Sequence, residues 1–299
     1  MVTSVLDQTV LVTGVGVPSG IGAAIARAFA QRGARLGLHF LETKPPHVDG
    51  IEIDIAFAGR PGAETVASEV RAIGAHAVLM PADLAVPSAI GPLFDAVERA
   101  LGPIDVLVNN AAHFEHPDSI FDVTAGTFDR YFAVNTRAPA LLMGEFARRY
   151  RARGGTFGRI INISTDWARA FPTQIGYGAS KLALEALTRS VAAEVGPLGI
   201  TVNAIAPGPT QTGYITPEME EALLPSIPLR RLGTPADIAD VVLMFASEEA
   251  RWMTGQVVQV AGGARALTNS AVGGRLCVAR VINNRLRFVV VTLLFSIKP

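Results

Sequence analysis

Short runs of β-branched and aliphatic residues alternate with segments of helical hydrophobic spacing from the start of the chain to about residue 263. The runs lie at 9–12, 35–39, 76–80, 106–108, 159–163, 201–205 and 257–260. Most are continuously apolar, which is typical of strands in a parallel sheet that is covered on both faces. The alternation predicts a single doubly wound α/β domain, with a mostly parallel seven-stranded sheet and helices on both faces.

Composition excludes several classes of protein. The 299 residues are 49% hydrophobic and carry a formal net charge of zero, so neither a nucleic acid nor an anionic membrane is an expected partner. The only cysteine, Cys277, cannot form an internal disulfide, which favours a reducing, cytoplasmic compartment. No signal peptide is visible, and the apolar run from Phe288 is too short to span a bilayer.

Two segments depart from the alternating pattern. Residues 43–62 are rich in Pro, Gly and polar residues, which predicts an extended loop after the second strand. Residues 264–299 contain five Arg, one Lys and no acidic residue. We therefore place the catalytic domain at 1–263 and treat 264–299 as an appendage. It is either an added interface strand or an unstructured, even non-native, extension, and we favour the extension.

A glycine-rich turn, Thr13-Gly-Val-Gly-Val-Pro-Ser-Gly-Ile-Gly22, links the first predicted strand to the first predicted helix. Glycines at such a turn let a pyrophosphate approach the backbone, and the helix N-terminus offers amide donors and the positive end of its dipole. An ordinary strand–helix connection is the competing interpretation. The position between strand and helix favours a Rossmann-type dinucleotide site.

Tyr177 and Lys181 lie four residues apart in a predicted helix and therefore share a face. An ammonium beside a phenol stabilises the phenolate and should lower its pKa toward the working range of a proton donor or acceptor. The spacing also occurs by chance on solvated helix faces, so the pair needs support from other residues.

Three further motifs supply that support. Asn109-Asn-Ala-Ala follows the fourth predicted strand, Ser164 ends the fifth, and Pro207-Gly208 follows the sixth. With the glycine turn and the Tyr/Lys pair, residues 8–263 resemble the short-chain dehydrogenase/reductase family. The resemblance is to the branch that includes the 3-oxoacyl-[acyl-carrier-protein] reductases, and it implies an enzyme that transfers a hydride between a nicotinamide and a carbonyl or secondary alcohol.

The resemblance implies a catalytic tetrad. Tyr177 would be the general acid in reduction, Lys181 would lower its pKa and hold the nicotinamide ribose, and Ser164 would bind the substrate oxygen. Thr165 is the neighbouring alternative to Ser164. Asn135 would support a water-linked proton relay to Lys181, although a buried Asn that only bridges backbone groups is a competing interpretation. No metal is implied, and the sequence has no His/Cys cluster to bind one.

The cofactor residues are carried over in the same way. Asp83 would meet the adenine, Asn109 would lie beside the adenosine ribose, and Thr212 would bind the nicotinamide carboxamide. The full set is Gly14, Gly20, Ile21, Gly22, Phe40, Asp83, Leu84, Asn109, Ala111, Tyr177, Lys181, Pro207, Gly208 and Thr212.

The chain departs from the family pattern at two places on the cofactor side. Five residues separate Gly14 from Gly20 where three are common, so either the loop bulges near Pro18 or Gly16 replaces the first glycine. The position that would choose the cofactor is Phe40, which is neutral. Glu42 could favour NAD(H), whereas Lys44 and His39 could serve the phosphate of NADP(H), which we favour.

The substrate is expected to be a small carbonyl or alcohol, with an acyl thioester among the candidates, under a lid between Gly213 and Leu232. Apolar lid residues such as Met219 and Ile227 could contact substrate or merely pack the lid, and Trp167 and Phe171 could line the pocket or the core. A sugar or other alcohol dehydrogenase and a non-catalytic nucleotide sensor are the alternatives. An enoyl reductase would have its Tyr and Lys further apart. The family commonly forms tetramers, so a homotetramer or homodimer is expected.

Overall fold

The computed structural model describes residues 7–44, 48–51, 58–264, 275–282 and 285–292, the last two ranges for their backbone only. The strands are β1 (Thr9–Val12), β2 (Arg35–Phe40), β3 (Ala77–Pro81), β4 (Val106–Asn109), β5 (Gly158–Ile163), β6 (Ile200–Pro207), β7 (Val257–Val260), β8 (Arg275–Ile282) and β9 (Arg285–Thr292). The helices of more than one turn are α1 (Ile21–Ala30), α2 (Gly59–Ala72), α3 (Ile90–Leu101), α4 (Ala125–Phe132), α5 (Ala138–Ala152), α6 (Ile175–Val195), α7 (Pro217–Leu223) and α8 (Pro235–Ala246).

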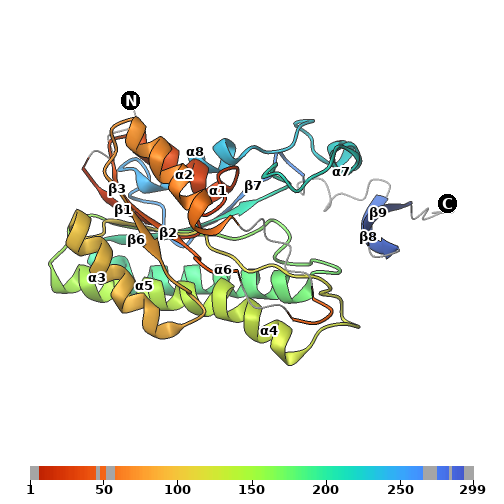
Figure 1. Ribbon diagram of the computed structural model, residues 1–299, viewed down its shortest axis with the longest axis horizontal. Coiled ribbons are helices and arrows are strands. Elements are labelled where there is room, and N and C mark those ends of the chain that lie inside the picture. The colour runs from red at the N-terminus through yellow and green to blue at the C-terminus, as the bar shows by residue number, and fades with distance from the viewer. Residues whose placement is uncertain (1–6, 45–47, 52–57, 265–274, 283–284, 293–299) are drawn as a thin grey trace.

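Seven of these strands form one parallel sheet, as predicted, and their order is β3-β2-β1-β4-β5-β6-β7. Val10 and Val12 belong to one apolar cluster with residues of α1, α2 and α8, whereas Leu11 belongs to a second cluster with residues of α3, α5 and α6. Neighbouring residues of a strand point to opposite faces, so the sheet is covered by helices on both sides (Figure 1). The continuously apolar strands follow from this double burial.

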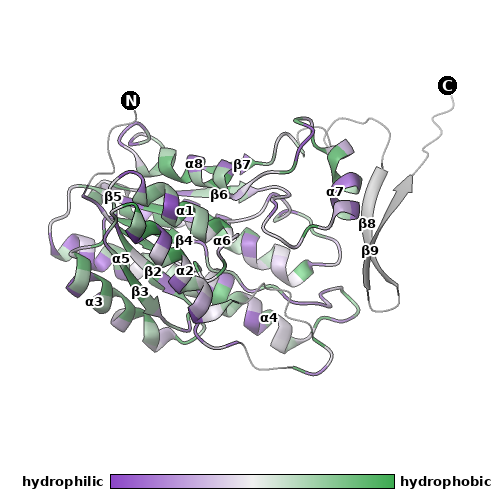
Figure 2. Cartoon of the chain, turned by 45° about the horizontal axis from the view of Figure 1, so that its top comes forward, coloured by the Kyte–Doolittle hydropathy of each residue, from purple (hydrophilic) through white to green (hydrophobic). Residues whose placement is uncertain are grey.

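The core is made of side chains that lie wholly out of solvent. Phe29 of α1, Phe94 of α3 and Phe146 of α5 are at most 1% exposed, and each contributes roughly 1.5–3 kcal/mol by leaving water. Figure 2 shows hydrophobic residues along the central strands, and both hydrophobic and hydrophilic residues along α3 and α4. This amphipathic pattern is what the helical spacing in the sequence predicts.

The strand order reverses between β1 and β4. From β1 the chain adds β2 and β3 on one side, and from β4 it adds β5, β6 and β7 on the other. In open parallel sheets a crevice forms at this point, at the carboxyl ends of the strands, and ligands bind there. The glycine turn follows β1, Asn109 ends β4, Ser164 follows β5 and Pro207 ends β6. The fold therefore brings all four predicted motifs to one edge of the sheet.

Two expectations are wrong in part. The predicted loop 43–62 ends earlier, because α2 already begins at Gly59; its residues 45–47 and 52–57 lie outside the described residues. The favoured unstructured tail is also incorrect for 275–282 and 285–292, where β8 and β9 pair antiparallel as a separate two-stranded sheet. The β-branched residues of this segment favour strands. No helix among the described residues is long and apolar enough to cross a membrane.

Candidate active site

The start of α6 is held by a carboxylate that lies far away in sequence. Asp118, 1% exposed, accepts hydrogen bonds from the backbone N–H groups of Gly176 (2.9 Å) and Tyr177 (3.0 Å). The residue at the N-cap position, Gln174, makes no capping bond with its own side chain. Asp118 therefore satisfies two of the otherwise unpaired donors of this helix end and fixes the backbone of Tyr177.

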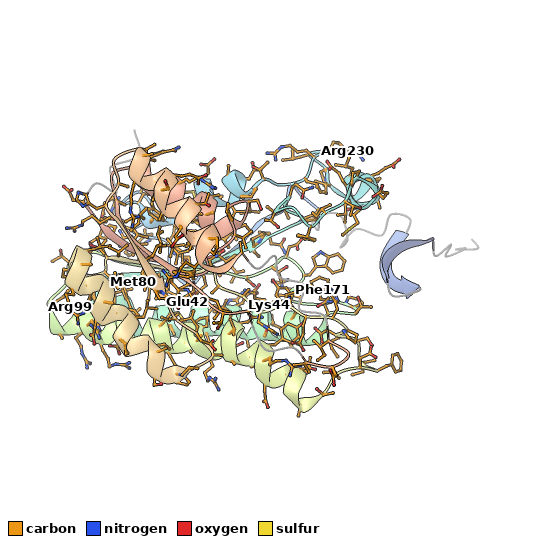
Figure 3. The ribbon with its side chains drawn as sticks, viewed as in Figure 1. Glu42, Lys44, Met80, Arg99, Phe171 and Arg230 are labelled. Atoms are coloured by element: carbon orange, nitrogen blue, oxygen red, sulfur yellow. The ribbon has the colours of Figure 1, made fainter. Side chains whose placement is uncertain are left out.

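Aromatic rings surround the side chain of Tyr177. Its ring centroid lies 5.0 Å from that of Phe114, 6.1 Å from that of Phe171 and 6.2 Å from that of Tyr131, all in edge-to-face arrangements. Trp167 packs on Phe171 at 5.0 Å, so these two aromatic residues line the surroundings of Tyr177. Phe171 is labelled in Figure 3.

Burial raises the pKa of the Tyr177 phenol, and nearby Tyr214 and Asp166 add to the rise. The expected lowering of this pKa is therefore not found for the chain alone, because burial outweighs the effect of the Lys181 ammonium. That ammonium lies 5.8 Å from the ring centroid of Tyr177 and donates its hydrogen bond to the Ile163 carbonyl. At neutral pH the phenol is protonated, which is the form that a proton donor needs.

Lys181 is fully inside the protein, at 2% exposure. Its Nζ donates a hydrogen bond of 2.8 Å to the carbonyl oxygen of Ile163, the last residue of β5. Burial lowers the pKa of Lys181 to about 8, so the side chain remains mostly charged at pH 7. The helix and the carboxyl end of β5 are thus joined beside Ser164.

Ser164 has a partner that the sequence analysis did not identify. Its Oγ donates a hydrogen bond of 2.9 Å to Oε1 of Glu185, and the two residues are 3% and 4% exposed. Glu185 follows Lys181 by four residues, so Tyr177, Lys181 and Glu185 form a row along α6. That spacing was the available signal. The alternative hydroxyl, Thr165, is half-buried and accepts a long contact of 3.4 Å from the N–H of Trp167.

Asn135 lies in a π-helical turn, 133–137, between α4 and α5. Such turns occur frequently at functional sites. Its Nδ2 donates to the carbonyl of His113 and to Oγ of Ser180, both at 3.0 Å, and its Oδ1 accepts from the N–H of His113 at 2.7 Å. These bonds match the bridging interpretation, since they join the amide to Ser180, the residue before Lys181, rather than to the Lys181 ammonium.

The structure shows where the extra residues of the glycine turn lie. Gly14, at φ +75°, packs on the backbone of Ala111, and a Cβ on Gly22 would lie 2.4 Å from the Gly14 carbonyl oxygen. Both glycines therefore occupy the close-packed places. The extra residues extend toward α2, where a Cβ on Gly62 would lie 2.0 Å from the Gly16 oxygen. Of the two alternatives, the bulge fits the structure.

The residues at this edge fit a dinucleotide. Gly20 is the N-cap of α1 and supplies no capping side chain, and the first turn of α1 has no acidic residue, so its N–H donors suit a pyrophosphate. Asn109 is 3% exposed and donates to Asn162 at 2.8 Å, but its Oδ1 is buried without a hydrogen-bond partner. Such an atom calls for a donor, which a ribose hydroxyl can provide. The neighbour Asn110, not predicted, ties the turn to β4 through bonds to the carbonyls of Thr13 (2.9 Å) and Gly14 (3.0 Å).

Charged residues lie where the adenosine end of a dinucleotide is expected. Phe40 is fully buried, and the guanidinium of Arg60 stacks 5.4 Å above its ring. Arg60 forms an ion pair with exposed Glu42. Lys44 is exposed nearby in sequence; Figure 3 labels Glu42 and Lys44. Arg60 was missed because it belongs to the segment that was predicted to be a loop.

His39 is unsuited to the phosphate role that the sequence suggested. It is 2% exposed, its Nδ1 accepts from the N–H of Gly14 at 3.2 Å, and its Nε2 lies 3.0 Å from the Ala82 carbonyl. Burial lowers its pKa to about 4, so the ring is neutral at pH 7 and holds the turn together.

The remaining predicted residues lie around the same edge. Asp83 Oδ1 accepts a hydrogen bond of 2.9 Å from the N–H of Ala85, which closes a local turn. Leu84 is buried, with 5% of its surface exposed. Ser19 of the glycine turn donates to the carbonyl of Thr212 at 2.7 Å. The other members are Ile21 at the start of α1, Ala111 after β4, Pro207 at the end of β6 and Gly208 directly after it.

The lid residues mostly pack on each other. Ile215, Ile227 and Leu232 are at most 6% exposed and form a small cluster with Met219 and Leu223. The interpretation that the apolar residues of α7 pack the lid is therefore the one that the structure supports.

Comparison with known proteins places this site in a family. The profile described as Enoyl-(Acyl carrier protein) reductase matches residues 46–265. "Uncharacterized oxidoreductase YjdA" of Bacillus subtilis (strain 168) is 36% identical over 86% of this chain and 96% of its own length. The chain belongs to the short-chain dehydrogenase/reductase family. It is an NAD(P)-dependent oxidoreductase that acts on small molecules.

Two further relatives carry more specific names. "NADPH-dependent aldehyde reductase 2, chloroplastic" of Arabidopsis thaliana is 34% identical over 83% of this chain and 91% of its own length. The solved structure titled "Promiscuous Reductase LugOII Catalyzes Keto-reduction at C1 during Lugdunomycin Biosynthesis" superposes with a TM-score of 0.75 at 33% identity, over 88% of this chain and 99% of that chain.

Proposed function

We propose that the protein is an NADP(H)-dependent carbonyl reductase, similar to the 3-oxoacyl-[acyl-carrier-protein] reductases, with Tyr177 as proton donor. The observation that carries the proposal is the placement of Lys181 and Ser164 at the end of β5, with Tyr177 one helical turn before Lys181 on α6. Lys181 binds the Ile163 carbonyl, Ser164 follows it, and Tyr177 begins the same helix with a protonated phenol. A substrate carbonyl oxygen that gains negative charge during reduction needs hydrogen-bond donors beside it, and Tyr177 and Ser164 carry such donors.

Each side chain has a defined task in this mechanism. Tyr177 donates its proton to the substrate oxygen, and Asp118 holds its backbone in place. The buried ammonium of Lys181 stabilises the phenolate that remains, because an opposite charge in a site of low dielectric lowers its free energy. Ser164 contributes a second hydroxyl at the oxygen. The bound nicotinamide supplies the hydride.

The preference for NADP(H) rests on Arg60. A guanidinium binds phosphate oxygens in a bidentate manner, and this one lies over Phe40 at the end of β2, where a 2′-phosphate is expected. Glu42 holds the guanidinium while no phosphate competes for it. Relatives whose names include NADPH-dependent reduction agree with this preference.

We further propose a cytoplasmic homodimer or homotetramer. The location rests on the single cysteine. Phe128 of α4, Leu141 of α5 and Leu182 of α6 are 36%, 37% and 41% exposed, and β7 is an edge strand of the sheet. Exposed apolar residues and an unpaired strand edge are features of surfaces that associate.

The test follows consumption of NADPH and NADH with a panel of β-ketoacyl thioesters, aldehydes, quinones and sugars, and formation of NADPH and NADH from the oxidised cofactors with the same sugars. The proposal predicts turnover of at least one ketone or aldehyde, faster with NADPH. Oxidation of sugars alone would favour a secondary-alcohol dehydrogenase. Tight NADPH binding without turnover of any member would favour a nucleotide-binding sensor and contradict the proposal.

A further inference from the structure

The hydrogen bond between Ser164 and Glu185 concerns the same atoms that the proposed reduction uses. A serine hydroxyl has one proton and a carboxylate has none, so Ser164 is the donor in this 2.9 Å bond. While the bond persists, the Ser164 proton is directed at Glu185. A substrate carbonyl, which can only accept, must compete with Glu185 for that proton.

Glu185 is a strong competitor. It is 4% exposed, and its other neighbour, the Arg189 guanidinium, lies 4.0 Å away and is half exposed. A hydroxyl bond to a carboxylate is about twice as strong as one between neutral groups. Breaking it to bind a neutral carbonyl would leave a buried carboxylate oxygen unsatisfied, which is costly.

The competition reverses during the reaction. As the hydride arrives, the carbonyl oxygen becomes an alkoxide, which is far more basic than a carboxylate and draws the hydroxyl proton into a stronger hydrogen bond. The proton stays on Ser164 throughout, and only its hydrogen-bond acceptor changes. Glu185 thus keeps the Ser164 bond from tightening ground-state binding, and the transition state gains the difference between the new bond and the bond given up.

We propose that Glu185 is a positioning residue that withholds the Ser164 hydrogen bond from the ground-state carbonyl and yields it to the transition state. This inference rests on the proposed function. Glu185 also lines a cavity of about 250 Å³ with Thr165, Asp166, Arg169 and Gln259, among others. Since Arg169 and Gln259 are exposed, the cavity reaches solvent.

The first experiment replaces Glu185 by Leu and measures KM and kcat with a slow carbonyl substrate, for which KM equals the dissociation constant. Ser164 is then free to donate to the carbonyl. KM should fall about tenfold, since the competing charge-assisted bond is gone, and kcat should not fall, since no bond to Glu185 then has to break as the alkoxide forms. E185Q, which keeps a neutral acceptor, should lie between. E194Q, at an exposed position on the same helix, should change neither constant.

The second experiment repeats E185L in an S164A background. If Glu185 acts through Ser164, the substitution should change KM and kcat there by less than about twofold, the size of ordinary additive error. An unchanged KM in E185L, or equal shifts with and without Ser164, would overturn the inference. Activity of the wild type and its loss in Y177F test the proposed function separately.

Should E185L fail to fold, E185A opens the position to the cavity. Added formate can then enter and accept the Ser164 proton. Restoration of the wild-type KM by formate in E185A, but not in E185A/S164A, would support the inference. A fall in KM that formate leaves unchanged would contradict it.

Discussion

The reacting end of the site and its adenosine end share one edge of the sheet, but they are built from different kinds of side chain. Lys181, Ser164 and Glu185 at the reacting end are at most 4% exposed, and each has a hydrogen-bond partner. At the adenosine end, Glu42 and Arg60 meet in an ion pair near the surface. Exposed pairs contribute little to stability and rearrange readily. Under the proposed function, the chemistry is therefore fixed in the core, whereas the choice of cofactor is set by groups that can change at little cost to the fold.

The sharpest contrast should come from Lys181→Met. Removal of the buried ammonium leaves the phenolate of Tyr177 without a counter-charge, so turnover should fall about 100-fold, the lower range for loss of acid–base function. Steady-state rates at saturating NADPH measure this. A variant that keeps more than half of wild-type turnover would show that the ammonium is dispensable.

The same substitution has a consequence for stability. The unfolded Lys side chain titrates at 10.5 and the folded one at about 8, so between these values the unfolded chain binds more protons. The free energy of unfolding of the wild type should therefore rise relative to K181M as pH increases from about 8 to 10.5, and the difference should be constant below that window. Urea denaturation across this range measures it; a relative fall with pH would contradict the burial argument.

Asp118→Ala tests the frame around Tyr177. Loss of the two backbone contacts should cost about 1 kcal/mol of stability, the usual value for a helix cap, and displacement of the phenol should lower kcat roughly tenfold. Asp118→Asn keeps one acceptor oxygen and should be intermediate. Asp122→Asn, an exposed carboxylate in the same loop, serves as the control and should behave as wild type. Equal activity of D118A and D122N would refute the positioning role.

At the adenosine end, Arg60→Ala should raise the KM for NADPH by about tenfold, the equivalent of one charged hydrogen bond, without a change in kcat. The KM for NADH should stay within about twofold because that cofactor lacks the 2′-phosphate. A parallel rise for both cofactors would assign Arg60 to general packing on Phe40.

The smallest effect is expected for Glu42→Gln. This change releases Arg60 from its ion pair and removes a negative charge near the 2′-phosphate, so the KM for NADPH should fall about two- to threefold, in keeping with a weak exposed pair. The KM for NADPH of E42Q and of wild type should be measured at low and at high salt. A rise in the NADPH KM would mean that the pair orients Arg60 for binding rather than competing with the phosphate.

The same contrast decides what the sequence could predict. Continuous apolar runs located the strands of the parallel sheet, because a strand that is buried on both faces needs apolar residues at consecutive positions. Tyr177, Lys181 and Ser164 were predicted from the family resemblance, which depends on their places relative to β5 and α6. Asp118 left no local signal, since it caps a helix that begins 57 positions later in the chain.

Charge balance was equally hard to predict. Proximity of Lys181 suggested a lowered pKa for Tyr177, but burial and neighbouring acidic groups dominate in the folded chain and raise it. Likewise, the sequence suggested His39 as a phosphate ligand, but in the fold it is hydrogen-bonded to the glycine turn and its burial keeps it neutral. In each case a long-range contact, invisible in local spacing, decides the electrostatics.

The most direct test of the account compares wild type and Tyr177→Phe for NADPH binding and for carbonyl turnover in the same preparation. Tyr177 is assigned proton donation only, so the variant should bind NADPH with a dissociation constant within about twofold of wild type and lose at least about 100-fold in kcat. If Y177F turns over a carbonyl substrate at the wild-type rate, the central assignment is wrong.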